Sequence, residues 1–99
     1  MSLQMFGLAR LGRDPEMRST ASGDSVLGLS LAFNVRVKGE KATTWVDASM
    51  WGKRAEALQP YLEKGGMVSV TLEDVHIESY KKADGTPQSK MVGKVTAID

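Results

Sequence analysis

The sequence predicts an all-β fold, a small barrel with one short helix, and three observations support this prediction. Several long segments alternate apolar and polar residues, as strands with one buried face do. Turns rich in glycine and proline separate these segments at short intervals. One segment in the middle of the chain, residues 53–62, spaces its apolar residues as a helix does. We therefore expect five strands, with the helix between the third and the fourth.

The first two strands are expected at residues 3–11 and 26–37. The first is apolar enough to be buried on much of both faces. In the second, large apolar residues from Leu27 to Val35 alternate with smaller or polar ones, so that one face is predicted to lie in the core. Between these strands, residues 17–19 are expected to pair briefly, with a turn on either side of them.

The third strand carries both tryptophans and runs directly into the helix. Its apolar face holds Val46, Ala48 and Met50, and its other face holds Trp45, Asp47, Ser49 and Trp51. Because two polar residues separate the indoles, we predict that the apolar face packs in the core and that the indoles lie outside. About 20 Å separates them at roughly 3.3 Å per residue. Such rings can stack with unpaired bases; burial in the core or in a subunit interface is the alternative interpretation.

The C-terminal half is predicted to form a short helix and then a long hairpin. Pro60 lies late in the helical segment and predicts a shortened or distorted end, with Tyr61 still on the apolar side. Apolar residues change parity halfway along the strand at residues 67–80, and a β-bulge at Glu73-Asp74 would reconcile the two phases. An Asp-Gly turn at residues 83–87 precedes the last strand, residues 88–98. This order of elements fits a five-stranded Greek-key barrel of the OB type.

Composition limits the classes of function. We expect residues 1–99 to form one domain, and the 41% apolar and 25% charged residues are typical of globular proteins. Cysteine is absent, which excludes disulfides and thiolate sites. The net charge is +1, so any electropositive surface must come from the placement of residues rather than from an excess. Neither a membrane span nor a signal-peptide pattern is visible, and we expect a cytoplasmic protein with no membrane partner.

The chain carries no recognisable catalytic or metal site. His76 is the only histidine and lies on a predicted strand. Asp14 and Glu16 belong to a turn around a proline, which does not suggest general acid–base chemistry. Gly65-Gly66 lacks the residues that follow the glycines of phosphate-binding motifs. We therefore expect a binding protein that needs no cofactor, and not an enzyme.

Several local strings occur in one order and at one spacing. They are Gly12-Arg13-Asp14-Pro15-Glu16-Met17-Arg18, Ser22-Gly23, Thr44-Trp45, Trp51-Gly52-Lys53 with Ala55-Glu56, and Tyr61-Leu62 with Lys64-Gly65. Together they resemble the single-stranded DNA-binding proteins of bacteria and phages, over about residues 5–98. The resemblance implies an OB-fold that binds single-stranded DNA without strong sequence preference in replication, recombination or repair. It also implies a homodimer or homotetramer that meets replication or recombination proteins in the bacterial cytoplasm or nucleoid.

The resemblance also implies where DNA would bind. The family's stacking aromatics fall on Trp45, Trp51 and Tyr80, the last after allowing for the insertion at Glu73-Asp74, and two of its basic positions fall on Arg18 and Lys53. Charged residues in and near the expected loops add Arg36, Lys38, Lys41, Arg54, Lys81 and Lys82 as candidate phosphate contacts. Taken singly, a lysine or arginine of this kind is more often an ordinary solvated surface charge than a phosphate contact.

The chain departs from the family at several positions. His76 and Glu78 stand where basic residues are common, which is expected to weaken phosphate contact. Val46 stands where the family often has a histidine at a subunit contact, and Val37 falls near a further family aromatic. The family's linker and acidic tail are missing from these 99 residues. We expect either a minimal phage-like or accessory version of the family, or a core domain.

Two other interpretations stay open at this stage. One is an accessory OB protein like primosomal replication protein B, which Ser89-Lys90-Met91-Val92 and Ile98-Asp99 faintly resemble. The other is an OB module whose aromatic face binds protein, which the near-neutral charge favours. The turn and tryptophan strings favour the first interpretation over both.

Overall fold

The computed structural model describes residues 2–99, and these form six strands and two short helices. The elements are β1 (Met5–Leu11), β2 (Glu16–Ser19), β3 (Ser25–Val37), β4 (Glu40–Trp51), α1 (Gly52–Leu58), the 3-10 helix η1 (Gln59–Tyr61), β5 (Met67–Lys81) and β6 (Pro87–Ile98). The short β2 is the pairing predicted at residues 17–19. The first strand begins at Met5 rather than at the predicted Leu3.

The strands form one sheet in the order β1-β5-β6-β4-β3-β2, in which β1 also pairs with β3. This additional pairing joins Arg10 to Ala32 and Leu11 to Leu31, so five strands close into a ring and β2 lies on the outer side of β3. Every pair is antiparallel except β4 with β6, which is parallel. The predicted all-β barrel of the OB type, with a helix between the third and fourth of its five long strands, is confirmed.

The barrel is filled from the faces that the alternation predicted. Along β3 the buried leucines are Leu27, Leu29 and Leu31, and along β4 the buried residues are Val46, Ala48 and Met50. They pack with Leu11 of β1 and with Leu72 and Val75 of β5 in one cluster. Removal of this apolar surface from water provides the main driving force for folding. Since strand side chains alternate, the same packing turns Trp45 and Trp51 outward.

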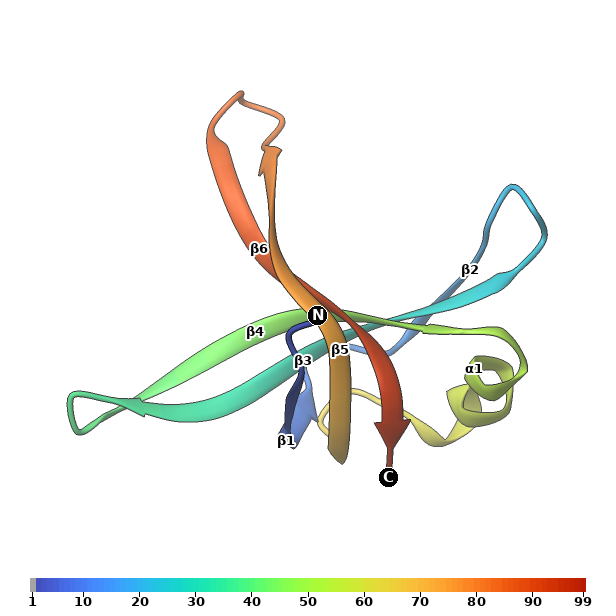
Figure 1. Ribbon diagram of the computed structural model, residues 1–99, viewed down its shortest axis with the longest axis horizontal. Coiled ribbons are helices and arrows are strands. Elements are labelled where there is room, and N and C mark those ends of the chain that lie inside the picture. Colours follow the sequence, from blue (N-terminus) through green and yellow to red (C-terminus); the bar gives the residue numbers. More distant parts are fainter. Residues whose placement is uncertain (1) are drawn as a thin grey trace.

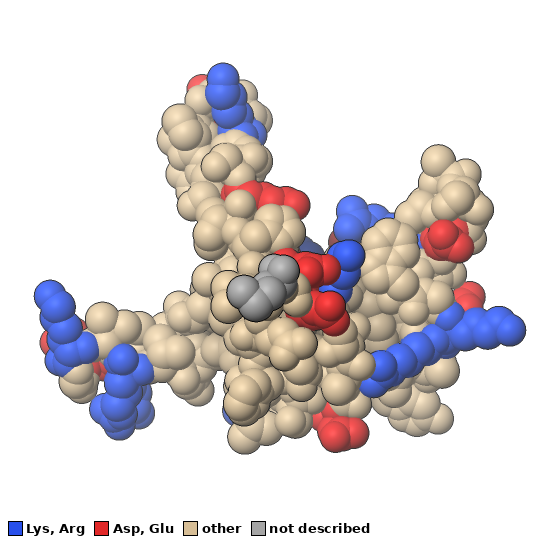
Figure 2. Space-filling view, viewed as in Figure 1, with Lys and Arg blue, Asp and Glu red and all other residues tan. Residues whose placement is uncertain are grey.

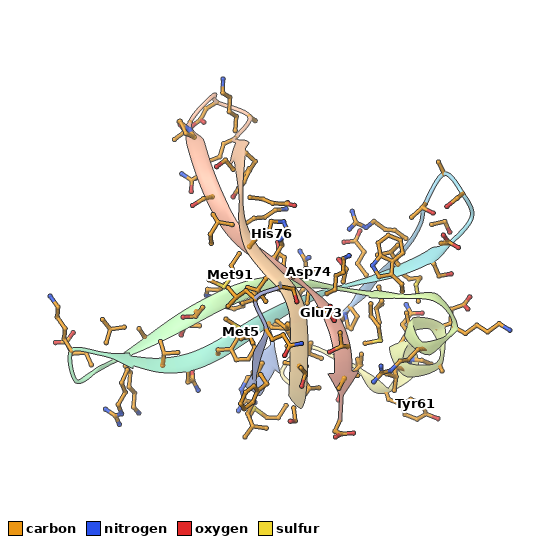
Figure 3. The ribbon with its side chains drawn as sticks, viewed as in Figure 1. Met5, Tyr61, Glu73, Asp74, His76 and Met91 are labelled. Atoms are coloured by element: carbon orange, nitrogen blue, oxygen red, sulfur yellow. The ribbon has the colours of Figure 1, made fainter. Side chains whose placement is uncertain are left out.

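The helical segment ends earlier than predicted. The α-helix stops at Leu58, one residue before Gln59-Pro60 begins a 3-10 turn, because proline has no N–H to donate to the helix. Tyr61 is therefore not packed on the core as its helical spacing suggested. Its side chain is 82% exposed and projects away from the barrel beside the helix (Figure 3).

A β-bulge lies where it was predicted, at the point where β5 leaves the barrel. The register between β5 and β6 shifts between Glu73 and His76, and Asp74 has a left-handed backbone with φ 55°. Beyond the bulge, β5 and β6 continue as a hairpin that projects from the barrel, as do the β3–β4 and β2–β3 hairpins (Figure 1). Ile77 shares this projecting part and is exposed, although it was predicted on the same face as buried Val75.

Gly12, in the loop between β1 and β2, lies against the ring of Trp45. Its amide donates a hydrogen bond to the Ser30 carbonyl at 2.9 Å, which fixes the loop over β3. A Cβ at this position would lie 2.5 Å from Cζ3 of Trp45, closer than carbon atoms can approach. The absence of a side chain at Gly12 therefore leaves room for the indole of Trp45, which is 55% exposed.

Replacing Gly12 by alanine should displace the indole of Trp45, since the ring is the more mobile of the two groups. In a Trp51→Phe background, Gly12→Ala should shift the fluorescence of Trp45 to the red and increase its quenching by acrylamide. Gly7→Ala is the matched control, because a Cβ there would make ordinary contacts of 3.6 Å with Phe33. Unchanged emission and quenching in Gly12→Ala would contradict this account of the ring's position.

Candidate nucleic-acid interface

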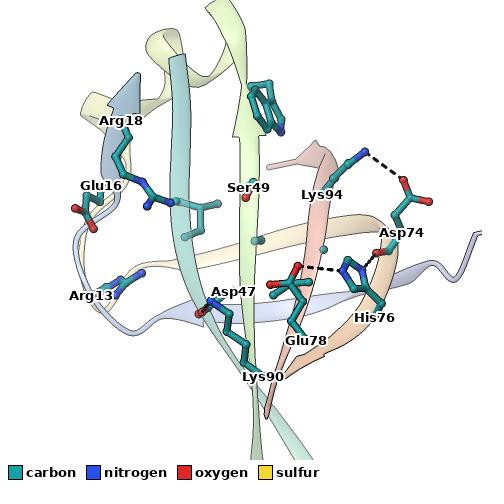
Figure 4. A pocket seen from close by; sticks show the side chains of 16 residues that line it. Arg13, Glu16, Arg18, Asp47, Ser49, Asp74, His76, Glu78, Lys90 and Lys94 are labelled. Atoms are coloured by element: carbon teal, nitrogen blue, oxygen red, sulfur yellow. Dashed lines mark hydrogen bonds and ion pairs between the residues drawn. The ribbon is translucent and has the colours of Figure 1, made fainter. Parts of the chain in front are cut away.

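A groove of about 570 Å³ crosses the outer face of β4, between β2 and β3 on one side and β5 and β6 on the other (Figure 4). Its floor includes Asp47, Ser49 and Trp51 of β4. One side carries Arg13, Glu16 and Arg18 from the β1–β2 loop and β2. The other side carries Asp74, His76 and Glu78 of β5 with Lys90 and Lys94 of β6. The groove is open and lined mainly by polar side chains, which suits an extended polar ligand better than a small apolar one.

The three predicted aromatic residues are all exposed, at different places around this groove. Trp51 lines the groove and is 49% exposed. Trp45 lies on the same face of β4, beyond the groove lining, and is 55% exposed. Tyr80 is 44% exposed on the β5–β6 hairpin, opposite Gln88 and with its ring centroid 5.7 Å from the ammonium of Lys90. The structure thus places one exposed aromatic ring on the floor of the groove, one further along β4 and one on the β5–β6 hairpin.

The predicted cations are more scattered than the aromatic residues. Of the eight, Arg18 lines the groove. Arg36, Lys38 and Lys41 belong to the β3–β4 hairpin, Lys81 and Lys82 to the tip of the β5–β6 hairpin, and Lys53 and Arg54 to α1. Figure 2 shows Lys and Arg side chains gathered at the ends of the β3–β4 and β5–β6 hairpins. The cations therefore surround the groove instead of filling it.

Two of the predicted cations have contacts within the chain. The guanidinium of Arg54 donates a hydrogen bond to the carbonyl of Thr96 at 2.8 Å, which ties α1 to the end of β6. The guanidinium of Arg36 donates a hydrogen bond to the carbonyl of Gly39 at 3.4 Å. Arg36 is also opposite Lys41 in the β3–β4 hairpin, where both line a second hollow of about 550 Å³. Arg54 therefore has a structural role, whereas the pair on the hairpin presents two positive charges together.

The sequence reasoning missed three cations that line the groove, namely Arg13, Lys90 and Lys94. Lys90 and Lys94 share one face of a predicted strand, which was a usable signal for a common surface. Their position beside β4 comes from the parallel pairing of β4 with β6, which aligns Lys94 with Ser49. Nothing local in the sequence indicates that pairing.

Acidic side chains balance the cations of the groove. Its lining includes the cations Arg13, Arg18, Lys90 and Lys94 and the carboxylates Glu16, Asp47, Asp74 and Glu78. Two lysines form ion pairs, Lys90 Nζ with Asp47 Oδ2 at 3.9 Å and Lys94 Nζ with Asp74 Oδ2 at 3.4 Å. With His76 neutral, these formal charges cancel.

His76 lies on the β5 side of this groove. Its Nδ1 lies 2.7 Å from the Asp74 carbonyl, and its Nε2 lies 3.3 Å from a carboxylate oxygen of Glu78 (Figure 4). The hydrogen bond to the Asp74 carbonyl, and then the one to Glu78, raise the pKa of His76 above its ordinary value of 6.5. The imidazole therefore keeps its positive charge to higher pH than an ordinary histidine does.

Among residues 2–99, no three His, Cys, Asp or Glu side chains cluster as metal ligands do. No helix in this part of the chain is both long and apolar enough to cross a membrane.

Comparison with known proteins identifies relatives over the whole barrel. The model of the single-strand binding protein family matches residues 3–98. The single-stranded DNA-binding protein of Chlamydia caviae is 41% identical over 96 residues, which cover 95% of this chain and 59% of that protein. The single-stranded DNA-binding protein 1 of Synechocystis sp. is 37% identical over 101 residues, which cover 99% of this chain and 80% of that protein.

A third relative is more distant. Single-stranded DNA-binding protein B of Bacillus subtilis is 33% identical over 85 residues, covering 83% of this chain and 74% of that protein. The chain spans less than two thirds of the length of its chlamydial relatives. A family match over residues 3–98, with such relatives along the same stretch, establishes that the chain belongs to the single-strand binding protein family.

Proposed function

We propose that this chain binds single-stranded DNA without strong sequence preference. The observation that carries the proposal is the outer face of β4, where two tryptophans are about half exposed beside a polar groove. Membership of the single-strand binding protein family supports the same ligand. Residues 1–99 would act as one DNA-binding domain, in replication, recombination or repair within the bacterial cytoplasm.

Stacking is the first contribution to binding. An unpaired base can lie flat on the open side of Trp51, Trp45 or Tyr80, and each such contact contributes about 1–3 kcal/mol. Every base has an aromatic face, so stacking requires no particular sequence. A duplex hides its base faces between neighbouring pairs, and these aromatic side chains should therefore discriminate against it.

Phosphate contacts are the second contribution. Arg18 lines the groove itself. The other predicted cations lie outside it, on the β3–β4 hairpin, the β5–β6 hairpin and α1, where DNA that extends beyond the groove could contact them. Each neutralised phosphate releases counterions and gives a log–log salt slope of about −0.7 on single strands. Because carboxylates also line the groove, stacking should supply an unusually large share of the binding free energy.

The direct test is a titration of intrinsic tryptophan fluorescence with oligo-dT, at low and moderate salt, beside duplex DNA of equal length. Strong quenching by oligo-dT, weak quenching by duplex and weakening with salt would support the proposal. Absence of quenching, with no shift of a labelled oligonucleotide even at low salt, would refute it. The aromatic face would then be a surface for a protein partner.

Truncation of the groove tryptophan should weaken binding most directly. Trp51→Ala should cost about 1–3 kcal/mol of binding free energy to oligo-dT, because it removes one stacking surface. Tyr61→Ala is the matched control, since it removes an aromatic side chain that is more exposed but lies outside the groove. Fluorescence anisotropy of a labelled oligonucleotide measures both, and equal losses in the two variants would contradict the assignment.

Binding should also depend on the protonation of His76. Below its raised pKa the imidazole is positive and adds one favourable charge to the groove, so affinity for oligo-dT should fall a few-fold as pH rises from 6 to 8. In His76→Gln the affinity should change little with pH, and a retained pH dependence would show that another group is responsible.

We propose in addition that the chain forms a homodimer or homotetramer through the outer face of β1. Phe6 and Leu8 both point away from the core and are 82% and 64% exposed. β1 pairs with β3 at Arg10 and Leu11, so residues 5–9 of that edge are not covered by β3. Exposed apolar residues beside an open strand edge are typical of a surface that pairs with another copy.

Acidic substitutions on the outer face of β1 should dissociate the proposed oligomer into single chains. Phe6→Glu combined with Leu8→Glu should lower the mass in solution to that of one chain, because burying two carboxylates in an apolar contact is unfavourable. Val37→Glu, at an exposed position on the β3–β4 hairpin, is the control and should leave the mass unchanged. Light scattering after gel filtration measures the mass; an unchanged oligomer in the double variant would place the interface elsewhere.

A further inference from the structure

Two lysines of β6 lie between the aromatic side chains of the proposed DNA path. Lys90 and Lys94 are on the outer face of β6, four residues and roughly 13 Å apart. Lys94 is aligned with Ser49, two residues before Trp51, and Lys90 lies 5.7 Å from the ring of Tyr80. A single strand of DNA that contacts both Trp51 and Tyr80 therefore passes the ammonium groups of Lys90 and Lys94.

Each of these lysines is paired with a carboxylate from a neighbouring strand. Lys90 pairs with Asp47 on the floor of the groove, and Lys94 pairs with Asp74 at the bulge of β5 (Figure 4). All four side chains are substantially exposed, and exposed ion pairs contribute little to folding stability. A contribution to folding stability therefore does not explain why both lysines of the groove form ion pairs.

A carboxylate and a phosphodiester present the same chemistry to an ammonium group, two anionic oxygens that accept its hydrogen bonds. We propose that Lys90 and Lys94 are phosphate-binding residues of the groove, and that Asp47 and Asp74 compete with DNA for them. When a strand binds, its phosphates replace the two carboxylates on the lysines. This inference rests on the proposed function and specifies which cations of the groove carry it.

The competition has a consequence for the path of the strand. Asp47 lies on the groove floor between the two tryptophans, so it repels any phosphate that approaches the floor. The sugar–phosphate backbone should therefore follow β6 and its lysines, with the bases turned toward β4 and Trp51. Asp47 and Asp74 also weaken DNA binding, because separating the two ion pairs offsets part of the free energy gained from phosphate contacts.

The test measures anisotropy of a fluorescein-labelled dT oligonucleotide over a series of salt concentrations, beginning with the wild-type chain. Lys90→Gln and Lys94→Gln should each reduce the magnitude of the log–log salt slope by about 0.7. Asp47→Asn and Asp74→Asn should tighten binding by about two- to five-fold, the range of a released exposed ion pair. Asparagine suits position 74 because it tolerates the left-handed backbone there.

A double-mutant cycle separates direct competition from general repulsion. If Asp47 acts by occupying Lys90, the gain from Asp47→Asn should largely disappear in the Lys90→Gln background, whereas simple repulsion of DNA would leave the gain intact. Glu63→Gln, with the same charge change outside the groove lining, is the control and should alter affinity much less than Asp47→Asn.

The outcomes distinguish this inference from the proposed function. A wild-type chain that does not bind oligo-dT at low salt would refute both. Normal binding with unchanged salt slopes in both lysine variants, or an equal gain from Asp47→Asn in both backgrounds, would overturn this inference alone. Thermal unfolding of each variant, followed by circular dichroism, confirms that the compared chains are folded.

Discussion

The burial of one face of β4 is the constraint on which the candidate site depends. Val46 and Met50 are almost completely inaccessible to solvent, and a slip of one residue would exchange them for the polar and aromatic face. Such a slip would bury Asp47 without a suitable partner, which costs several kcal/mol of folding free energy. The outward direction of Trp45 and Trp51 thus follows from core packing. The outer face of β4 is held in place because its inner face is packed in the core.

The groove itself needs a second device, the bulge at Asp74. Without an inserted residue, β5 would keep one parity along its whole length, and His76 would point into the barrel like Leu72 instead of into the groove. The bulge restores inward packing for Val75 and bends the β5–β6 hairpin out of the barrel, so that Lys90 and Tyr80 form a wall. Core packing and groove shape are therefore coupled at one residue with a left-handed backbone.

Local patterns predicted what depends on alternation and turn chemistry. These include the buried face of β3, the exposure of Trp45 and Trp51, the bulge and the Asp-Gly hairpin. The pairing of β4 with β6 depends instead on closure of the whole barrel, and the alignment of Lys94 with Ser49 could not be read from either strand. The prediction that Tyr61 packs on the apolar side of the helix was wrong for a different reason. Tyr61 has the right helical spacing, but the α-helix ends at Leu58, before Pro60, and Tyr61 belongs to the 3-10 helix that follows.

The near-neutral groove has a physical consequence for how this surface can bind a polyanion. A strongly positive groove gains affinity from counterion release and loses it steeply with salt. Here carboxylates such as Asp47 and Asp74 offset the lysines, so long-range attraction is weak and the aromatic faces must contribute relatively more. Stacking requires accessible base faces, whereas phosphate attraction also acts on duplexes. If the chain binds DNA as proposed, a groove with this balance of charges has a lower affinity for any polyanion. The discrimination between single strands and duplex DNA would then depend more on the tryptophans.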